Sequence, residues 1–278
     1  MSTTVELVRN SADVARVVFH SEDGVQVLSR TCLDQLKTIV KSLKSEKSLR
    51  IIVFEAQGRT FLAGADINEL KELNRKTARR FAREGQRLLQ RIADLPAVTI
   101  AAVHATCAGG GLELALACDV RFSAAAARIG APEVTLGLIP GWGGTVRATL
   151  LFGAAVARRL ILSGELIPAA EAQRLGIVDA VFPDDQFRSE VDARIAQFLK
   201  AGAAASVAAK RLIGDIDSVE LEDLLELEAE HFADCYATAE PAEGIAAFLE
   251  KRPAGWAAGA SFPAAPMLAP AVKASTGD

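Results

Sequence analysis

An apolar run at residues 98–103 constrains the fold most, because a strand that is apolar at successive positions is buried on both faces. Such strands belong to parallel sheets, in which helical crossovers connect the strands and cover the sheet. The neighbouring chain has strand-like residues at 14–19, 50–56, 119–123 and 177–182, and helical spacing of apolar residues at 33–44, 75–95 and 112–117. This order of segments predicts an α/β domain with a largely parallel sheet.

The pattern becomes mainly helical after Pro140. Residues 154–162 and 169–175 have helical spacing, and a glycine that suits a helix C-cap closely follows each. From residue 185 to residue 251 the chain is almost entirely helical by pattern. We therefore expect three parts: a core at residues 1–195, a helical oligomerisation region at 196–252, and an Ala-, Pro- and Gly-rich tail at 253–278 that is disordered.

The composition argues against several functional classes. The chain of 278 residues has a formal charge of −4 and only 5 % aromatic residues, so we expect no nucleic-acid partner. Its four cysteines form no C-x-x-C pair and its three histidines are scattered, so we expect free thiols in a reducing compartment and no metal site. It has no apparent signal peptide and no apolar run of membrane-spanning length, which predicts a soluble, cytoplasmic protein.

Two glutamates stand in an otherwise apolar stretch, each just after a glycine-marked turn. Glu113 follows Gly109-Gly110-Gly111, and Glu133 follows Gly130-Ala131-Pro132. A carboxylate in apolar surroundings is costly unless it is paired or takes part in chemistry. Taken singly, Glu113 could be a helix-start carboxylate that gains from the helix dipole, and Glu133 an exposed loop acid. Together they suggest an acid/base pair that faces a polarised carbonyl.

Glycine-rich turns could supply the groups that polarise such a carbonyl. Residues 59–67 follow a strand and open into a helix, and the triple glycine does the same, so both turns leave backbone N–H groups unpaired. Two loops that each offer an N–H make an oxyanion hole plausible. The alternatives are an ordinary strand-to-helix turn and close packing of a helix on a strand. A third turn, residues 139–145, could present N–H groups and the Trp142 ring to a ligand, or could be a helix entry capped by Thr145.

Three further groups have simpler interpretations. His104 and Cys107 are close in sequence, but nothing else supports a Cys/His dyad, so His104 is interpreted as structural. The acids Glu226, Glu228, Glu230 and Asp234 are interpreted as a solvated helix face. The arginines at residues 79–91 are also interpreted as a solvated helix face, although they are the one feature that favours an RNA-binding module.

Residues 61–67, 108–115, 118–119 and 130–145 together resemble the crotonase superfamily, and are most similar to the enoyl-CoA hydratases. Weaker similarity extends over nearly the whole chain except the tail. The resemblance implies a ClpP/crotonase-like spiral of ββα units with C-terminal helices. It also implies trimers that often pair into hexamers, an acyl-CoA thioester substrate, and no metal or redox cofactor.

By the family's pattern, the backbone N–H groups of Ala65 and Gly110 form the oxyanion hole. Glu113, as a carboxylate, activates a water molecule, and Glu133, as an acid, gives a proton to the α-carbon. The N–H of Gly141 helps to position that water. Substrate contacts are expected from the adenine end of CoA near Ala63, Gly64, Asp66 and Ile67, and from Trp142, which could narrow the acyl pocket.

The resemblance favours a lyase that adds water to a 2-enoyl-CoA to give a 3-hydroxyacyl-CoA. Isomerases of the family usually keep only the acid at the Glu133 position, so Glu113 favours hydration over double-bond isomerisation. Hydration of an unusual acyl group remains an alternative, as does a CoA- or RNA-binding module without catalysis. The chain departs from the family at Ala105, Ala131, Trp142 and Val146, and none of these departures removes an expected catalytic group.

Overall fold

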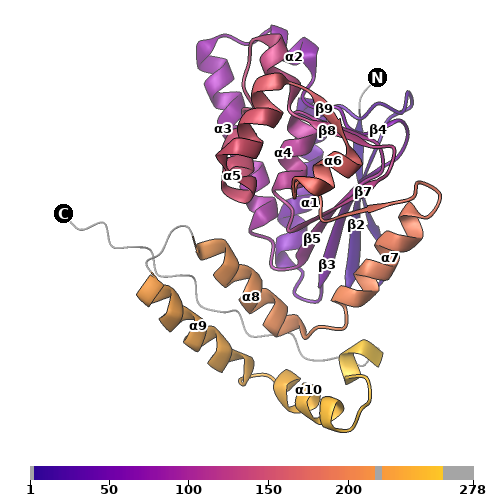
Figure 1. Cartoon of the computed structure of the whole chain (residues 1–278), viewed down its shortest axis with the longest axis vertical. Helices are drawn as coiled ribbons and strands as arrows, with labels where there is room; N and C mark the ends of the chain where they lie inside the picture. The colour runs from indigo at the N-terminus through magenta and orange to yellow at the C-terminus, as the bar shows by residue number, and fades with distance from the viewer. Residues whose placement is uncertain (1–2, 217–220, 259–278) are drawn as a thin grey trace. The chain divides into compact units, whose positions relative to one another are not determined.

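The computed structural model describes residues 3–216 and 221–258. The chain divides into two compact units, Met1–Leu95 with Thr99–Asp192, and Pro96–Val98 with Ala193–Asp278. The first unit contains both sheets, and the change from one unit to the other lies close to the expected boundary at residue 195. Figure 1 shows the strands of the first unit side by side, with helices packed along them.

The larger sheet has six strands in the order β1-β2-β3-β5-β7-β10. Strands β1 and β2 pair antiparallel, whereas β2–β3, β5–β7 and β7–β10 pair parallel. The predicted α/β class with a largely parallel sheet is therefore confirmed. The strands are β1 (Thr4–Arg9), β2 (Val14–His20), β3 (Ile51–Ala56), β5 (Val98–Val103), β7 (Val120–Ala124) and β10 (Ala180–Phe182).

The smaller sheet has four strands in the order β4-β6-β8-β9. Parallel pairs join β4 to β6 and β6 to β8, and β9 is antiparallel to β8. None of these strands was predicted, because each is only three residues long and shows no periodic pattern of its own. They are β4 (Thr60–Leu62), β6 (Thr106–Ala108), β8 (Arg128–Gly130) and β9 (Leu166–Pro168).

The two sheets arise from a repeated ββα order. In three successive repeats the first strand (β3, β5 or β7) enters the larger sheet, the second (β4, β6 or β8) enters the smaller sheet, and a helix follows. The parallel neighbours β4, β6 and β8 therefore end at one edge of the smaller sheet, and so do the turns that follow them. This arrangement brings the turns around residues 63–66, 109 and 131 together.

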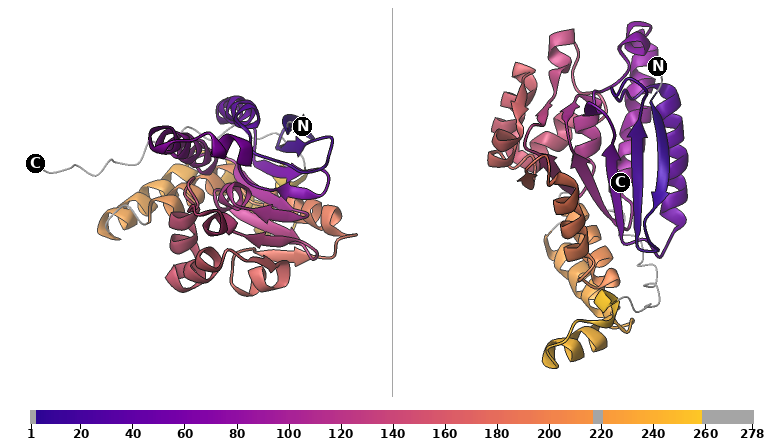
Figure 2. Two further views of the ribbon diagram at one scale, coloured as in Figure 1. Left: turned by 90° about the horizontal axis from the view of Figure 1, so that it is seen from above. Right: turned by 90° about the vertical axis from the view of Figure 1, so that its right-hand side faces the viewer.

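Side chains cap some helices of the first unit, whereas others begin at a glycine or a proline without such a cap. Ser29 accepts a hydrogen bond from the backbone N–H of Cys32, and Asn74 forms a capping box with Thr77. Two views in Figure 2 show these helices along the strands. They are α1 (Arg30–Ser45), α2 (Ile67–Lys71), α3 (Arg75–Ala93), α4 (Gly110–Leu116), the 3-10 helix η1 (Pro132–Leu136), α5 (Gly144–Ser163) and α6 (Ala169–Arg174); α7 (Phe187–Phe198) spans the change of unit.

The predicted helix at residues 154–162 is confirmed as the second segment of α5, but the segment before it was not predicted. Helix α5 already begins at Gly144 and is interrupted at Gly153, whose φ of 79° and ψ of 159° are not helical. A glycine tolerates this positive φ, so the chain turns there and the helix resumes. The predicted C-cap is confirmed, because Gly164 has a left-handed conformation with φ of 65°.

The second unit contains helices α8 (Ala203–Asp215), α9 (Leu221–Cys235) and α10 (Glu240–Leu249), with α8 and α9 side by side (Figure 1). The buried carboxylate of Glu240 accepts hydrogen bonds from the backbone N–H of Ala204 at the start of α8. In the predicted tail, Gly255–Ala258 forms a 3-10 helix, and Trp256 donates its indole N–H to the carbonyl of Lys200. Residues 259–278 lie outside the described residues.

Among the helices of the described residues, none combines the length and the apolar character that a membrane span requires.

Candidate active site

Three turns meet at the edge of the smaller sheet, and glycine makes their close approach possible. Gly64 and Gly109 have φ of 108° and 53°, which an L side chain rarely adopts. A Cβ on Gly64 would lie 3.6 Å from the backbone nitrogen of Gly110. The N–H of Gly109 donates to the carbonyl of Gly130, at 3.1 Å. The first turn therefore lies against the second, and the second is bonded to the third.

The backbone N–H groups of Ala65 and Gly110 are available to a ligand. The carbonyl of Gly64 accepts from the N–H of Leu28 at 2.8 Å, and across a trans peptide the N–H of Ala65 points the opposite way. Gly110 is the first residue of α4, where an N–H has no partner within the helix. Within the part of the chain that the structure describes, neither N–H has an acceptor.

Glu113 lies one turn into α4, and only 4 % of its surface is exposed. Its Oε1 accepts hydrogen bonds from the backbone N–H of Trp142 at 2.7 Å and of Gly144 at 2.8 Å. Burial raises the pKa of Glu113 to about 7; the Glu133 carboxylate also raises it, and the two N–H donors oppose the rise. The side chain is therefore held in one orientation and can exchange a proton near neutral pH.

Glu133 lies in the first turn of η1 and its carboxyl group packs against Gly109, since a Cβ on that glycine would be 3.2 Å from Glu133 Oε1. Its Oε2 is buried and has no hydrogen-bond partner among the described residues. Burial raises the pKa of Glu133 as well. An unsatisfied buried carboxyl oxygen is costly in a folded protein, so it indicates a position where a ligand or a proton is received.

The geometry thus brings together four of the residues expected from the sequence: two free N–H groups at Ala65 and Gly110, and two carboxyl groups with raised pKa values, buried at Glu113 and half-buried at Glu133. A family model described as enoyl-CoA hydratase/isomerase matches residues 9–259. The chain belongs to this enoyl-CoA hydratase/isomerase family, within the crotonase superfamily.

Relatives and solved structures agree with this assignment. The chain is 33 % identical to crotonyl-CoA hydratase of Syntrophomonas wolfei, over 84 % of this chain and 90 % of that protein. It is 37 % identical to the mitochondrial methylglutaconyl-CoA hydratase of Rattus norvegicus, over 83 % and 75 %. A crystal structure of enoyl-CoA hydratase from Bacillus anthracis superposes with a TM-score of 0.85 at 30 % identity, covering 90 % of this chain and 98 % of that one. The predicted crotonase fold is therefore confirmed.

In this hydratase/isomerase the third glycine-rich turn supports Glu113 through its backbone. Gly143 has φ of 108° and serves as the N-cap of α5, so the alternative of a cap at Thr145 is wrong. The carbonyl of Gly141 accepts from Gln86 Nε2 at 2.9 Å, whereas its N–H has no acceptor among the described residues. Trp142 is only 2 % exposed.

Arg147 was not singled out from the sequence, yet it holds this turn. Its Nη1 donates to the carbonyl of Trp142 at 3.0 Å and its Nη2 donates to Gln90 Oε1 at 3.1 Å. Its positive charge also lowers the pKa of Glu113. One indication was available: Arg147 is the only charged residue between Glu133 and Arg158.

The residues expected near the adenine end of CoA surround the start of α2. Asp66 is the N-cap of this helix and accepts from the N–H of Asn68 at 2.8 Å, and Ile67 is exposed. The N–H of Ala63 donates to the carbonyl of Gln26. A cavity of about 420 Å³ beside this segment is lined by Arg30, Asn68, Glu69, Glu72, Leu73 and Thr77.

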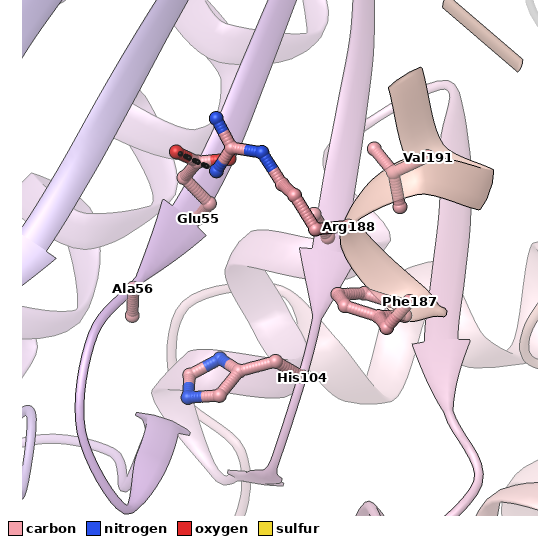
Figure 3. Close-up of a pocket in the computed structure, with 7 residues that line it drawn as sticks. Glu55, Ala56, His104, Phe187, Arg188 and Val191 are labelled. Carbon is pink, nitrogen blue, oxygen red and sulfur yellow. Dashed lines mark hydrogen bonds and ion pairs between the residues drawn. The ribbon is translucent and has the colours of Figure 1, made fainter. Parts of the chain in front are cut away.

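A second cavity, of about 240 Å³, has different surroundings (Figure 3). His104 lines it together with the Glu55–Arg188 ion pair, and His104 Nε2 lies 3.0 Å from the carbonyl of Gly58. Burial raises the pKa of the Cys107 thiol well above its usual range, so this thiol is a poor nucleophile. None of the residues that line this cavity belongs to the expected site.

No group of three or more His, Cys, Asp or Glu side chains within the described residues is arranged to hold a metal ion.

Proposed function

We propose that this enzyme adds water across the double bond of a 2-enoyl-CoA, with Ala65 and Gly110 binding the thioester oxygen and Glu113 and Glu133 moving the protons. The observation that carries the proposal is the convergence of two unpaired N–H groups with the buried carboxyl group of Glu113 and the half-buried one of Glu133, whose Oε2 has no partner among the described residues. Two N–H donors on one oxygen stabilise the enolate-like charge that develops during addition, and one such donor is worth about 3–4 kcal/mol.

The two carboxyl groups have different hydrogen-bond surroundings, which supports different roles. Two close carboxyl groups resist being ionised together, so one proton is retained by the pair. Two N–H donors favour the charged form of Glu113, whereas Glu133 Oε2 has no donor. In the proposed reaction the Glu113 carboxylate takes a proton from water, the hydroxyl adds to the β-carbon, and the carboxyl of Glu133 gives its proton to the α-carbon.

The surrounding residues fit a CoA thioester. The N–H of Gly141, which has no acceptor among the described residues, would help to position the water. The adenine end of CoA would lie near Ala63, Gly64, Asp66 and Ile67, beside the cavity at the start of α2. In this proposal CoA is part of the substrate, and no separate cofactor takes part.

We further propose that the chain works in the cytoplasm as a trimer or a pair of trimers, with the helices of residues 196–252 in the subunit contacts. Large apolar side chains are exposed on α9 and α10, including Phe232 and Phe248, and such side chains are usually covered in an assembly.

The test is hydration of crotonyl-CoA, followed by the loss of the ultraviolet absorbance of the conjugated thioester. We expect Glu113→Gln and Glu133→Gln each to lower the rate by about 10²–10⁴-fold, because each removes a proton-transfer group and keeps the side-chain shape. Glu22→Gln, at an exposed position, is the matched control and should keep full activity.

Unchanged rates in both active-site variants would overturn the proposed roles. Conversion of a 3-enoyl-CoA to the conjugated isomer without any hydration would instead favour the isomerase activity that the family description also contains.

A further inference from the structure

The Trp142 ring fills the space between helices α3 and α4, and two glycines make room for it. A Cβ on Gly85 of α3 would lie 2.1 Å from Trp142 Cδ1, and a Cβ on Gly110 of α4 would lie 2.6 Å from Trp142 Cζ3. These atoms belong to the five-membered and six-membered rings respectively. The long dimension of the indole therefore reaches from one helix to the other.

Trp142 contacts both the proposed oxyanion hole and one of the two proposed catalytic carboxyl groups. Its ring lies against Gly110, whose N–H would bind the thioester oxygen, and its own backbone N–H donates to Glu113 at 2.7 Å. In the proposed reaction the acyl carbons would begin at the carbonyl carbon bound at Gly110 and continue past the carboxyl groups. An acyl chain that extends toward α3 beyond the double bond therefore meets the indole.

Several contacts hold the Trp142 ring in place. The rings of Phe81 and Trp142 have centroids 5.2 Å apart. Arg147 binds the carbonyl of Trp142, and Gln86 binds the carbonyl of Gly141. Swinging the indole away would break ring packing on α3 and disturb the turn that orients Glu113. Neither of the two cavities described above is lined by Trp142, Phe81 or Gly85, so neither offers space for an acyl chain beside the Trp142 ring.

On the basis of the proposed function, we propose that Trp142 closes the acyl end of the site and restricts this enzyme to crotonyl-sized substrates. A longer acyl group needs an apolar cavity that buries its added methylenes. The indole occupies that volume here. A smaller side chain at this position would leave room for a longer acyl chain.

The experiment compares hydration of crotonyl-CoA with that of 2-octenoyl-CoA by wild type and by Trp142→Ala. The ratio of the two kcat/KM values is the readout, because it does not depend on the fraction of active protein. We expect wild type to favour crotonyl-CoA and Trp142→Ala to raise the octenoyl-to-crotonyl ratio by about 10-fold or more, since one methylene in an apolar pocket is worth about that much. Phe54→Leu, buried in β3, is the control for general loosening and should leave the ratio unchanged.

The outcomes separate this inference from the proposed function. A wild type that hydrates neither substrate contradicts the proposed function itself. A wild type that hydrates both equally well, or a Trp142→Ala variant with the wild-type ratio, overturns the role of Trp142 and leaves hydration intact. If Trp142→Ala does not fold, Trp142→Leu keeps an apolar side chain at this position and is judged by the same ratio.

Discussion

Glu113 combines a buried position with hydrogen bonds that favour its charged form, and this balance makes the enzyme sensitive to pH. With a pKa raised to about 7, Glu113 is ionised above neutrality and gains a proton below it. If it activates water as a carboxylate, kcat/KM for crotonyl-CoA should rise with pH, with a midpoint near 7, until Glu133 loses the proton that it donates. The check is a pH–rate profile from about pH 5 to about pH 9. A flat profile across neutrality would contradict the assigned role.

The same raised pKa predicts an effect on stability. The folded protein holds the Glu113 proton up to about pH 7, whereas an ordinary glutamate releases it at 4.5. Because the folded state binds more protons between these values, the free energy of unfolding falls as pH rises through this interval. At about 1.4 kcal/mol per pH unit, the cost above pH 7 approaches about 3 kcal/mol.

Glu113→Gln should therefore raise the free energy of unfolding by up to about 3 kcal/mol at pH about 8, and by little at pH about 4. Denaturant unfolding at the two pH values measures this difference, with Glu22→Gln as the control. An equal effect of Glu113→Gln at both pH values would mean that burial of the charge is not the cause.

At the residue level, the sequence revealed the candidate site residues because they interrupt strongly apolar segments. Glu113 and Glu133 are visible as polar residues in apolar segments, and the glycines mark the turns beside them. Arg147 was missed because it acts through the carbonyl of Trp142, a group that every residue carries. Because any residue could supply that carbonyl, the sequence of the turn does not reveal the contact.

Helix α3 contributes a single glycine, Gly85, at the point where the Trp142 ring reaches it. Gly85→Ala should destabilise the fold by about 1–3 kcal/mol, because the new methyl group would overlap the indole and force it to move. Gly214→Ala is the matched control, since that glycine also lies in a helix and a Cβ there would meet nothing within 4 Å. Thermal unfolding of both variants measures the difference, and a Gly85→Ala variant as stable as the control would mean that the indole can shift without cost.

Elements with long apolar or periodic patterns were predicted well, and the short strands of the smaller sheet were missed. Strand β5 was identified because successive buried positions leave an apolar run, and α3 because one face is apolar over many turns. The strands of the smaller sheet are three residues each, too short for any period to show. The segment of α5 before Gly153 was missed because its first two turns carry exposed apolar residues such as Val146 and Leu150, which blur the contrast between faces.

Across the whole molecule, exposed apolar side chains predict association of copies. Phe232 on α9 and Phe248 on α10 are 67 % and 82 % exposed in the isolated chain. We expect the wild-type protein to be a homo-oligomer in solution, and Phe232→Glu to lower its mass, because a charge on that surface disfavours burial in an interface. Light scattering after size exclusion measures the mass, and Glu228→Gln on the same helix is the control. A monomeric wild type would contradict the expectation.

The successive ββα repeats have a consequence for how such an enzyme can change. In the proposed mechanism, activation of the thioester depends on the first two turns, through Ala65 and Gly110, while the proton donor Glu133 comes from the third. Each of the three turns follows its own short strand. A substitution in the third turn can therefore alter which reaction follows, while the capacity to stabilise an enolate is inherited unchanged from the other two.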